Sequence, residues 1–340
     1  MNTFPLHQLP DKAYEHALRS MEIYDLLAYS LCSKNTKEAI KSLNLKKCWI
    51  EIFVHNSIEM EVCYEDDVPL KCCFAYDPSF PNNQVIAREN IKIVVDPYGD
   101  EESKRWESNF QNFDFKEYLH HFCDVLQSPK IGAFDFCGEN LDETSIEPIQ
   151  KAIEGLQIEV LVIGEQLTHE FAKKVLESFP NYEDLFFDQI PFESQKIHEM
   201  DKYSIQNLKF VSIPDTEGIR IDQVLVSNSK RISLRVSKFS EKDLNRFLKL
   251  WICGSNPRLR FFYASGQPLL GRDSFDMNLI LKGIKGNQIP LDSEEVHIWE
   301  VDEYEYYETK LAGEYRIWSF NGTTAVIRSL PQGQFEFMVE

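Results

Sequence analysis

The sequence predicts an α+β protein that contains an α/β repeat-like segment. Three observations support this class: three short helical patterns at the N-terminus, period-two alternation after residue 47, and an apolar pattern that recurs from residue 131. The chain has 340 residues, which suggests about two or three domains. Its hydrophobic content of 43% supplies a sizeable core and excludes a globally disordered protein.

The charge of the chain excludes some classes of partner. The whole chain carries 36 Lys plus Arg and 55 Asp plus Glu, a net charge of −19, whereas the first 50 residues alone carry +2. An acidic surface disfavours nucleic acid and anionic membranes. No apolar run approaches the roughly 20 residues that span a bilayer, and the N-terminus lacks a signal-peptide pattern. We therefore expect an intracellular protein, in the cytoplasm, the nucleus or both.

The N-terminal 46 residues predict a small module of three short helices. Apolar residues recur at helical spacing after Asp11, again around residues 26–31, and a third time after Ser33. Helices of this length bury little surface by themselves. We therefore expect the module to pack against another domain or another chain.

Residues 47–127 predict an antiparallel β-meander followed by a helix. Polar and apolar residues alternate over 48–54, 58–64 and 70–76, and turn residues 55–57 separate the first two runs. A further strand is expected at residues 91–95. Apolar residues at helical spacing over 115–126 then predict one helix.

Residues 128–265 predict leucine-rich-repeat-like units. Apolar triplets start at residues 131, 158, 182, 208, 231 and 259, so the steps are 27, 24, 26, 23 and 28 residues. Leucine-rich repeats have periods of about 20–29 residues, each with a strand and a helix or turn. We expect the six strands to be neighbours in one largely parallel sheet. Ser240 and Asp243 form a capping-box pattern that predicts the start of one intervening helix.

Residues 266–340 predict a β-rich end to the chain. Asn321-Gly322 lies between two alternating runs, the strongest short signal for a β-hairpin. Upstream, residues 294–308 contain seven acids and no Lys or Arg, together with Trp299 and three tyrosines. This segment is either a binding surface for a basic partner or an exposed strand whose other face is core.

The sequence contains no convincing catalytic or cofactor-binding constellation. Phosphate-loop, dinucleotide-binding, zinc-protease and nucleophile-elbow motifs are all absent. The best metal-like cluster is His120, His121 and Cys123, but adjacent positions on a helix point in different directions and do not converge on one ion. We therefore expect no enzymatic activity, no cofactor and no metal.

Two motifs in order resemble a known family. Residues 4–37, with FPLHQLPD at the start and DLLAYSLCSKNTK at the end, resemble an F-box of the nematode type. Residues 240–259, SEKDLNRFLKLWICGSNPRL, are similar to the signature of the F-box-associated domain of the second type, and residues 281–284 and 321–325 fit its tail. The third F-box helix lacks the Trp that many F-boxes carry there.

The resemblance implies a substrate-recognition subunit of an SCF (cullin-RING) ubiquitin ligase. The F-box would dock on a Skp-type adaptor, and through it on a cullin, while the C-terminal domain would bind a target protein. An alternative remains open: a repeat-scaffold protein that binds its partner by sequestration, without ligase docking. The implied division is 1–46 F-box, 47–127 meander plus helix, 128–265 repeat-like part and 266–340 β-rich part of the F-box-associated domain.

Candidate binding residues follow from the resemblance and from the acidic segment. Those carried over by position to the adaptor interface or its immediate support are Pro5, Leu6, Leu9, Pro10, Leu18, Leu26, Leu27 and Leu31. Of these, Leu26, Leu27 and Leu31 are expected to form the hydrophobic contact. The candidates for target binding are Trp299, Tyr304 and Tyr306, because exposed aromatic residues supply anchoring energy at protein interfaces.

Overall fold

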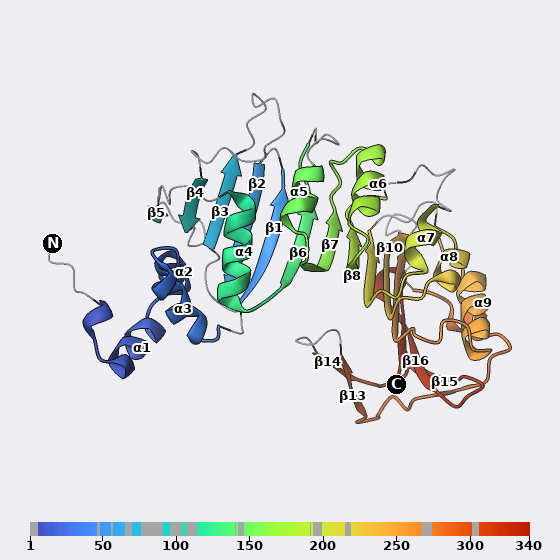
Figure 1. Ribbon diagram of the computed structural model, residues 1–340. Coiled ribbons are helices and arrows are strands. Elements are labelled where there is room, and N and C mark those ends of the chain that lie inside the picture. Colours follow the sequence, from blue (N-terminus) through green and yellow to red (C-terminus); the bar gives the residue numbers. More distant parts are fainter. Residues whose placement is uncertain are drawn as a thin grey trace. The chain divides into compact units, whose positions relative to one another are not determined.

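The structure of the protein is a computed structural model with two compact units, Met1–Tyr182 and Glu183–Glu340, each of which contains strands and helices (Figure 1). It describes residues 6–45, 48–55, 57–64, 70–75, 91–95, 104–106, 114–139, 141, 146–190, 192, 199–214, 219–266, 274–300 and 306–340. Among these residues no helix combines the length and the apolar character needed to cross a bilayer.

The first unit begins with the three predicted short helices. A 3-10 turn, η1 (Leu6–Gln8), precedes α1 (Asp11–Arg19), α2 (Ile23–Ser30) and α3 (Lys34–Ser42). Ser33 caps α3, because its side chain accepts the N–H of Thr36 while Thr36 accepts the N–H of Ser33. Further along the described part of this unit lie α4 (Phe115–Leu126), α5 (Ile146–Ala152) and α6 (His169–Ser178).

The sheet of the first unit is mixed. Its strands are β1 (Cys48–Val54), β2 (Ser57–Tyr64), β3 (Leu70–Ala75), β4 (Ile91–Val95), β5 (Lys104–Trp106), β6 (Lys130–Phe136) and β7 (Gln157–Ile163). Within the unit the strand order is β7-β6-β1-β2-β3-β4-β5. Each pair from β1 to β5 is antiparallel, whereas β6 is parallel to both β1 and β7.

One face of this sheet forms the core of the first unit. Alternate residues of β1, such as Ile50 and Ile52, are completely buried. Trp49, which lies between the buried residues Cys48 and Ile50 of the same strand, is 37% exposed. Helices α4, α5 and α6 lie over the buried face (Figure 1). Buried rings pack edge to face between α4 and the sheet, with Phe74 5.3 Å from Phe115 and 5.7 Å from Tyr118 between ring centroids.

The second unit also contains parallel and antiparallel strand pairs together with helices. Its strands are β8 (Tyr182–Phe187), β9 (Phe210–Ile213), β10 (Arg231–Ser237), β11 (Phe261–Gly266), β12 (Gly286–Gln288), β15 (Tyr315–Trp318), β16 (Thr324–Leu330) and β17 (Gln334–Val339). Strands β8 to β11 pair in parallel, and β11 then pairs antiparallel with β17. The helices are α7 (Asp201–Ser204), α8 (Ile221–Val226), α9 (Glu241–Ile252) and α10 (Met277–Ile280), and a short turn η5 (Pro331–Gly333) joins β16 to β17.

The second unit has an aromatic core under α9. Phe247 and Trp251 of α9 pack against Phe337 of β17 at 5.3 and 4.9 Å between ring centroids, and Phe262 of β11 lies 4.9 Å from Phe247. All these side chains are buried. The α9 helix therefore holds β17, the last strand of the chain, onto the parallel strands.

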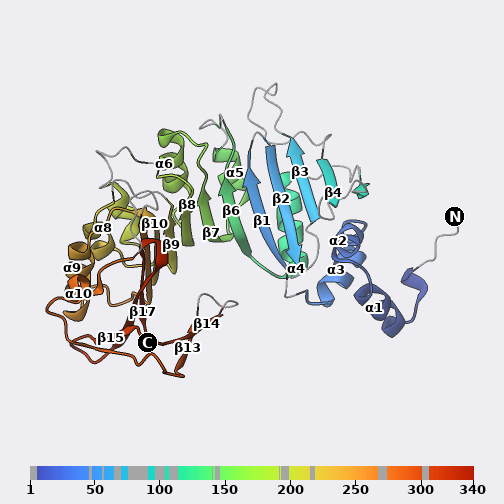
Figure 2. The same ribbon diagram turned by 180° about the vertical axis from the view of Figure 1, so that it is seen from behind.

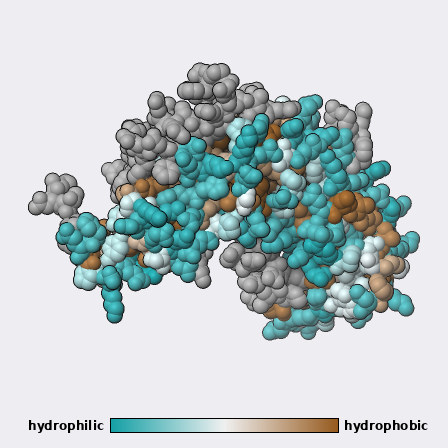
Figure 3. All heavy atoms as spheres, in the orientation of Figure 1, coloured by the Kyte–Doolittle hydropathy of each residue, from teal (hydrophilic) through white to brown (hydrophobic). Residues whose placement is uncertain are grey.

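A patch of hydrophobic surface lies over α7 and α8 in Figure 3, where Ile205 and Val226 are large exposed residues.

The structure confirms the coarse prediction of N-terminal helices followed by mixed sheet with helices. Ser240 caps α9 with Asp243 as predicted, and Asn321-Gly322 joins β15 to β16, with Gly322 at φ +87°, a left-handed value that favours glycine. All six predicted repeat strands are strands, and those within one unit that pair do so in parallel. The leucine-rich-repeat-like interpretation, the meander assignment and the four-part domain division stay predictions.

Candidate functional site

The candidate docking residues at the start of the F-box-like module are accessible. Leu6 lies in η1 and Leu9 follows it; both side chains are half-buried, and Pro10, which precedes α1, is exposed. Pro5 lies outside the described residues. This end of the module therefore has apolar surface that the packing of the module leaves exposed. The surface over α1 and α3 is otherwise largely hydrophilic in Figure 3.

The other candidate docking residues occupy the interior of the module. Leu18, Leu26 and Leu27 are buried, whereas Leu31, directly after α2, is half-buried. These buried leucines lie in α1 and α2, so they suit the supporting role implied by the resemblance. In this structure Leu26 and Leu27 offer no free surface for the hydrophobic contact we expected them to form, whereas the half-buried Leu31 does offer such surface.

Polar contacts attach the three-helix module to α4. Lys37 and Lys41 of α3 both form ion pairs with Asp124 of α4, at 2.7 and 2.5 Å. The side-chain amide of Gln127, which ends α4, donates to the carbonyl of Lys41 at 2.8 Å. These contacts join residues more than 80 positions apart in the sequence. They fix the module to the domain that follows it.

The predicted metal-like cluster on α4 has structural partners. His120 Nε2 lies 2.9 Å from the carbonyl oxygen of Ala152, at the end of α5. His121 Nε2 lies 2.9 Å from the hydroxyl of Ser30, which itself donates to the carbonyl of Leu27. Cys123 is buried. The two histidines therefore contact different parts of the unit, the end of α5 and the end of α2.

His121 makes the contact between the module and α4 sensitive to acid. Burial, and secondarily the charge of Lys37, lower the pKa of His121 from 6.5 to about 4, while Asp124 acts in the opposite direction. Between pH 6.5 and 4 the unfolded chain therefore binds a proton that the folded chain does not, so acid favours unfolding. Stability from this residue is present above pH 6.5 and is lost as the pH falls.

We predict that His121→Gln flattens part of the pH dependence of unfolding. Between pH 7.5 and pH 5 the wild-type chain should lose more unfolding free energy than the variant, by at most about 1–2 kcal/mol after solvent screening. Urea titrations at the two pH values give the difference. Equal losses in both chains would show that His121 does not bind its proton differently on unfolding. His7→Gln, at an exposed position, is the matched control.

The candidate target-binding residues lie in or near a separate two-stranded sheet. Strand β13 (Val296–Glu300) pairs antiparallel with β14 (Tyr306–Lys310), and neither pairs with the larger sheet. Trp299 lies in β13 opposite Tyr307, and Tyr306 lies in β14 opposite Glu300. Tyr304 lies outside the described residues. The structure thus places Trp299 and Tyr306 on the two arms of one ribbon, the β13–β14 hairpin.

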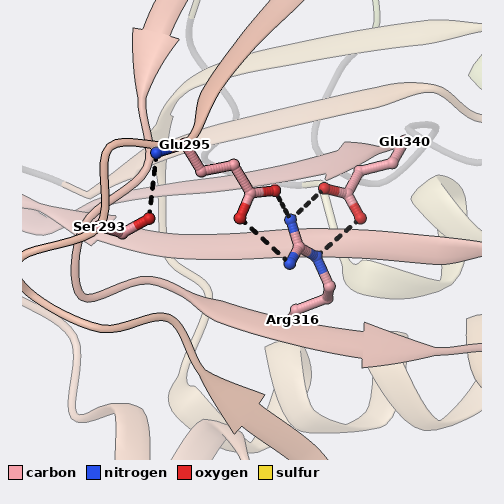
Figure 4. Close-up of polar contacts among 4 residues, drawn as sticks. All are labelled: Ser293, Glu295, Arg316 and Glu340. Carbon is pink, nitrogen blue, oxygen red and sulfur yellow. Dashed lines mark hydrogen bonds and ion pairs between the residues drawn. The ribbon is translucent and has the colours of Figure 1, made fainter.

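An arginine at the base of the β13–β14 hairpin connects it to the main sheet. Arg316 of β15 donates to both carboxylate oxygens of Glu295, directly before β13, and to both of Glu340, directly after β17 (Figure 4). Glu340 and then Glu295 raise the pKa of the guanidinium above its already high value. The sequence offered no sign of this contact, because the three residues come from separate segments. The contact holds the start of the hairpin beside β15.

A small apolar cluster supports the same base. Ile289 and Leu311, which flank the β13–β14 hairpin in sequence, pack with Val326 of β16 and Met338 of β17. Backbone hydrogen bonds close the neck, from the N–H of Leu311 to the carbonyl of Glu295 and from the N–H of Gly313 to that of Ile289. The hairpin is therefore anchored at its base by burial and by charge.

Within the described residues one group of possible metal ligands lies close together. Donor atoms of Glu51, Glu61 and Cys63 are within 4.8 Å of one another on β1 and β2. Lys71 of β3 already pairs with Glu61 at 2.5 Å. Burial, followed by the charges of Glu51 and Glu61, raises the pKa of the Cys63 thiol to about 12. A protonated thiol beside an ammonium group does not favour a cation there.

Comparisons with known proteins agree with both motifs. The F-box domain family matches residues 6–48, and the F-box associated family of the second type matches residues 199–264. The chain is also similar to the F-box associated domain-containing protein sdz-33 of Caenorhabditis elegans, with 25% identity over 288 residues, 83% of this chain and 84% of the relative. No solved structure matches. Together these matches support a nematode-type F-box protein with an F-box-associated domain of the second type.

Proposed function

We propose that the protein is the substrate-recognition subunit of an SCF ubiquitin ligase. F-box proteins of this kind are adaptors, and the F-box family match over residues 6–48 is the observation that carries the proposal. The F-box docks on a Skp-type adaptor, which connects it to a cullin. The half-buried Leu6, Leu9 and Leu31 and the exposed Pro10 are the side chains suited to that contact.

The attachment of the F-box to α4 supports this role. A ligase subunit must hold its target at a stable position relative to the adaptor, and the ion pairs of Asp124 with Lys37 and Lys41 restrict motion between the F-box and the sheet of the first unit. The Ser30–His121 contact is buried and adds to the restriction. No chemistry by the chain itself is required, because the adaptor's function is to bring two proteins together.

Copurification tests ligase docking. The full chain expressed in nematode cells should retain a Skp-type adaptor and a cullin through washing at physiological salt. The alternative function, a scaffold that sequesters its partner, predicts that neither is retained although the target is. Recovery of a target without adaptor or cullin from a folded chain would therefore replace the ligase proposal with sequestration.

We propose further that the β13–β14 hairpin contributes to target binding. Residues 294–308 combine seven acids with four aromatic residues, and the hairpin is separate from the large sheet but anchored through Arg316. Aromatic side chains supply contact area, and acids speed encounter with a basic surface in a salt-dependent way. The target surface is accordingly basic or neutral.

Replacing Trp299, Tyr304 and Tyr306 with Ala should remove target proteins from the purified complex while the adaptor stays. Each lost anchor at an interface costs about 2 kcal/mol or more, so the triple variant should bind at least 100-fold more weakly. Circular dichroism checks folding, and quantitative mass spectrometry compares the recovered partners. A matched variant, Tyr24→Ala with Tyr29→Ala in the F-box, should instead leave targets bound. An unchanged partner list in the folded triple variant would rule the hairpin out.

A further inference from the structure

The second unit contains a basic stretch in an otherwise acidic chain. Residues 230–285 hold 12 Lys plus Arg and four Asp plus Glu, a net charge of +8, whereas the whole chain carries −19. The count includes Arg272 and Asp273, which lie outside the described residues and cancel each other in charge. Helices α9 and α10 belong to this stretch and pack against each other (Figure 2). A surface formed here favours an acidic partner over a basic one.

Three exposed lysines, Lys249, Lys282 and Lys285, lie near the contact between α9 and α10. Nζ of Lys249 lies 3.6 Å from the position that a Cβ on Gly283 would take, so the ammonium group stands over the turn that follows α10. The side-chain amide of Asn245 on α9 donates to the carbonyl of Lys282 at 3.0 Å. This hydrogen bond holds the turn, and the two lysines in it, beside Lys249.

The charges of these three lysines are available to a partner. Within the described part of the chain none of them forms an ion pair or a side-chain hydrogen bond, whereas the neighbouring Arg246 pairs with Asp222 at 2.9 Å. The described acids of the stretch lie at helix starts: Glu241 and Asp243 in the first turn of α9, and Asp276 as the N-cap of α10. The C-terminal end of α9 therefore presents positive charge to solvent.

An exposed aromatic ring lies at the same end of α9. Phe320, in the turn between β15 and β16, is 74% exposed. Its backbone N–H donates to the carbonyl of Ile252 at 2.9 Å, and a Cβ on Gly254 would come within 2.6 Å of its Cε1 atom. The ring is thus held against the end of α9 while most of it faces solvent. A ring that is already positioned loses little conformational freedom on binding, and aromatic residues are enriched at protein interfaces.

We propose that this end of α9 is a docking surface for an acidic segment of a partner protein that also carries a bulky apolar residue. We call Lys249, Lys282, Lys285, Phe320 and Leu279, which is 50% exposed on α10, the lysine surface. Carboxylates of the partner pair with the ammonium groups, and its apolar residue packs on the Phe320 ring. The chain's net charge of −19 favours such a segment over nucleic acid, whose phosphates the rest of the chain repels.

The test is the affinity of the full chain for a fluorescein-labelled peptide, DEDFDED, measured by anisotropy at physiological salt. Lys249→Ala with Lys282→Ala should weaken binding at least about fivefold, because two ion pairs with the peptide are lost. Lys12→Ala with Lys34→Ala removes two exposed lysines from the F-box and changes the net charge equally. This control should alter the affinity less than about twofold.

A second peptide, DEDGDED, tests the contact with the ring. Phe320→Ala should weaken binding of DEDFDED about threefold to tenfold and leave binding of DEDGDED unchanged, because only the first peptide has a side chain to pack on Phe320. If the variant at Lys249 and Lys282 does not fold, Lys282→Ala with Lys285→Ala, which changes no helical residue, gives the same comparison of charge.

Equal losses in the two double-lysine variants would overturn the proposal, since binding would then follow net charge alone. So would a wild-type chain that does not bind DEDFDED, or a Phe320→Ala chain that binds both peptides as the wild type does. Tighter binding of labelled oligothymidine, with the same dependence on Lys249 and Lys282, would make nucleic acid the occupant instead. The assay contains no adaptor or cullin, so its result does not depend on ligase docking.

Discussion

Leu9→Ala with Pro10→Ala should abolish retention of the Skp-type adaptor. Leu9 is half-buried and Pro10 is exposed at the start of α1, so the pair offers apolar surface where the F-box begins. Truncating a Leu at the centre of an interface costs about 2–4 kcal/mol, which is roughly a 30- to 1000-fold loss of affinity. Pull-down with purified adaptor, followed by calorimetry, measures the loss.

A matched control separates docking from folding. Pro290→Ala with Leu291→Ala removes the same two residue types from the second unit, where both are exposed, and should leave adaptor binding unchanged. Circular dichroism melting should show both variants folded, because neither pair lies in a core. Undiminished adaptor binding by the variant at Leu9 and Pro10 would end the proposal that this end of the F-box docks.

Phe337→Ala should unfold the second unit at markedly lower denaturant concentration. Phe337 is completely buried and packs edge to face on Phe247 and Trp251 at 5.3 and 4.9 Å. Removing a buried phenylalanine side chain leaves a cavity and costs about 3–5 kcal/mol. The loss reaches α9, which lies within the sequence signature at residues 240–259, because α9 packs on this strand. Urea unfolding followed by tryptophan fluorescence gives the change.

Phe320→Ala is the control for that experiment. Phe320 lies two residues beyond β15 and is 74% exposed, so its truncation should change the unfolding free energy by less than about 0.5 kcal/mol. A similar small change for Phe337→Ala would contradict the placement of Phe337 in the core. Adaptor binding by the first unit is a second measurement on the same variant, and it should be unchanged by Phe337→Ala.

Local elements of this protein were predictable because their signals are local. Ser33 and Ser240 cap α3 and α9 through hydrogen bonds to residues three positions away, and Asn321-Gly322 turns a hairpin through the freedom of glycine. Strand spacing of about 25 residues leaves space for a crossover, which parallel pairing requires. Such patterns depend on neighbours within a few turns of chain, which the sequence displays directly.

The sequence pattern did not show which of the F-box leucines are buried. Leu26, Leu27 and Leu31 all lie on or next to α2 and all read as apolar contact positions, yet the first two are buried and the third is half-buried. Hydrophobicity indicates that a side chain leaves water, but it does not say whether the chain itself or a partner covers it. That choice follows from how α2 packs on α3 and how α3 packs on α4.

By itself the sequence determined the family, the order of helices and strands, and the positions where an adaptor and a target are expected. Only the tertiary structure brought Ser30 to His121, Arg316 to Glu295 and Glu340, and Trp49 over Gly132. These contacts join residues far apart in the chain or on neighbouring strands, and their energies depend on distance and burial. Periodicity in one chain carries neither quantity, so the anchor of the F-box and the base of the hairpin emerged only with the packed fold.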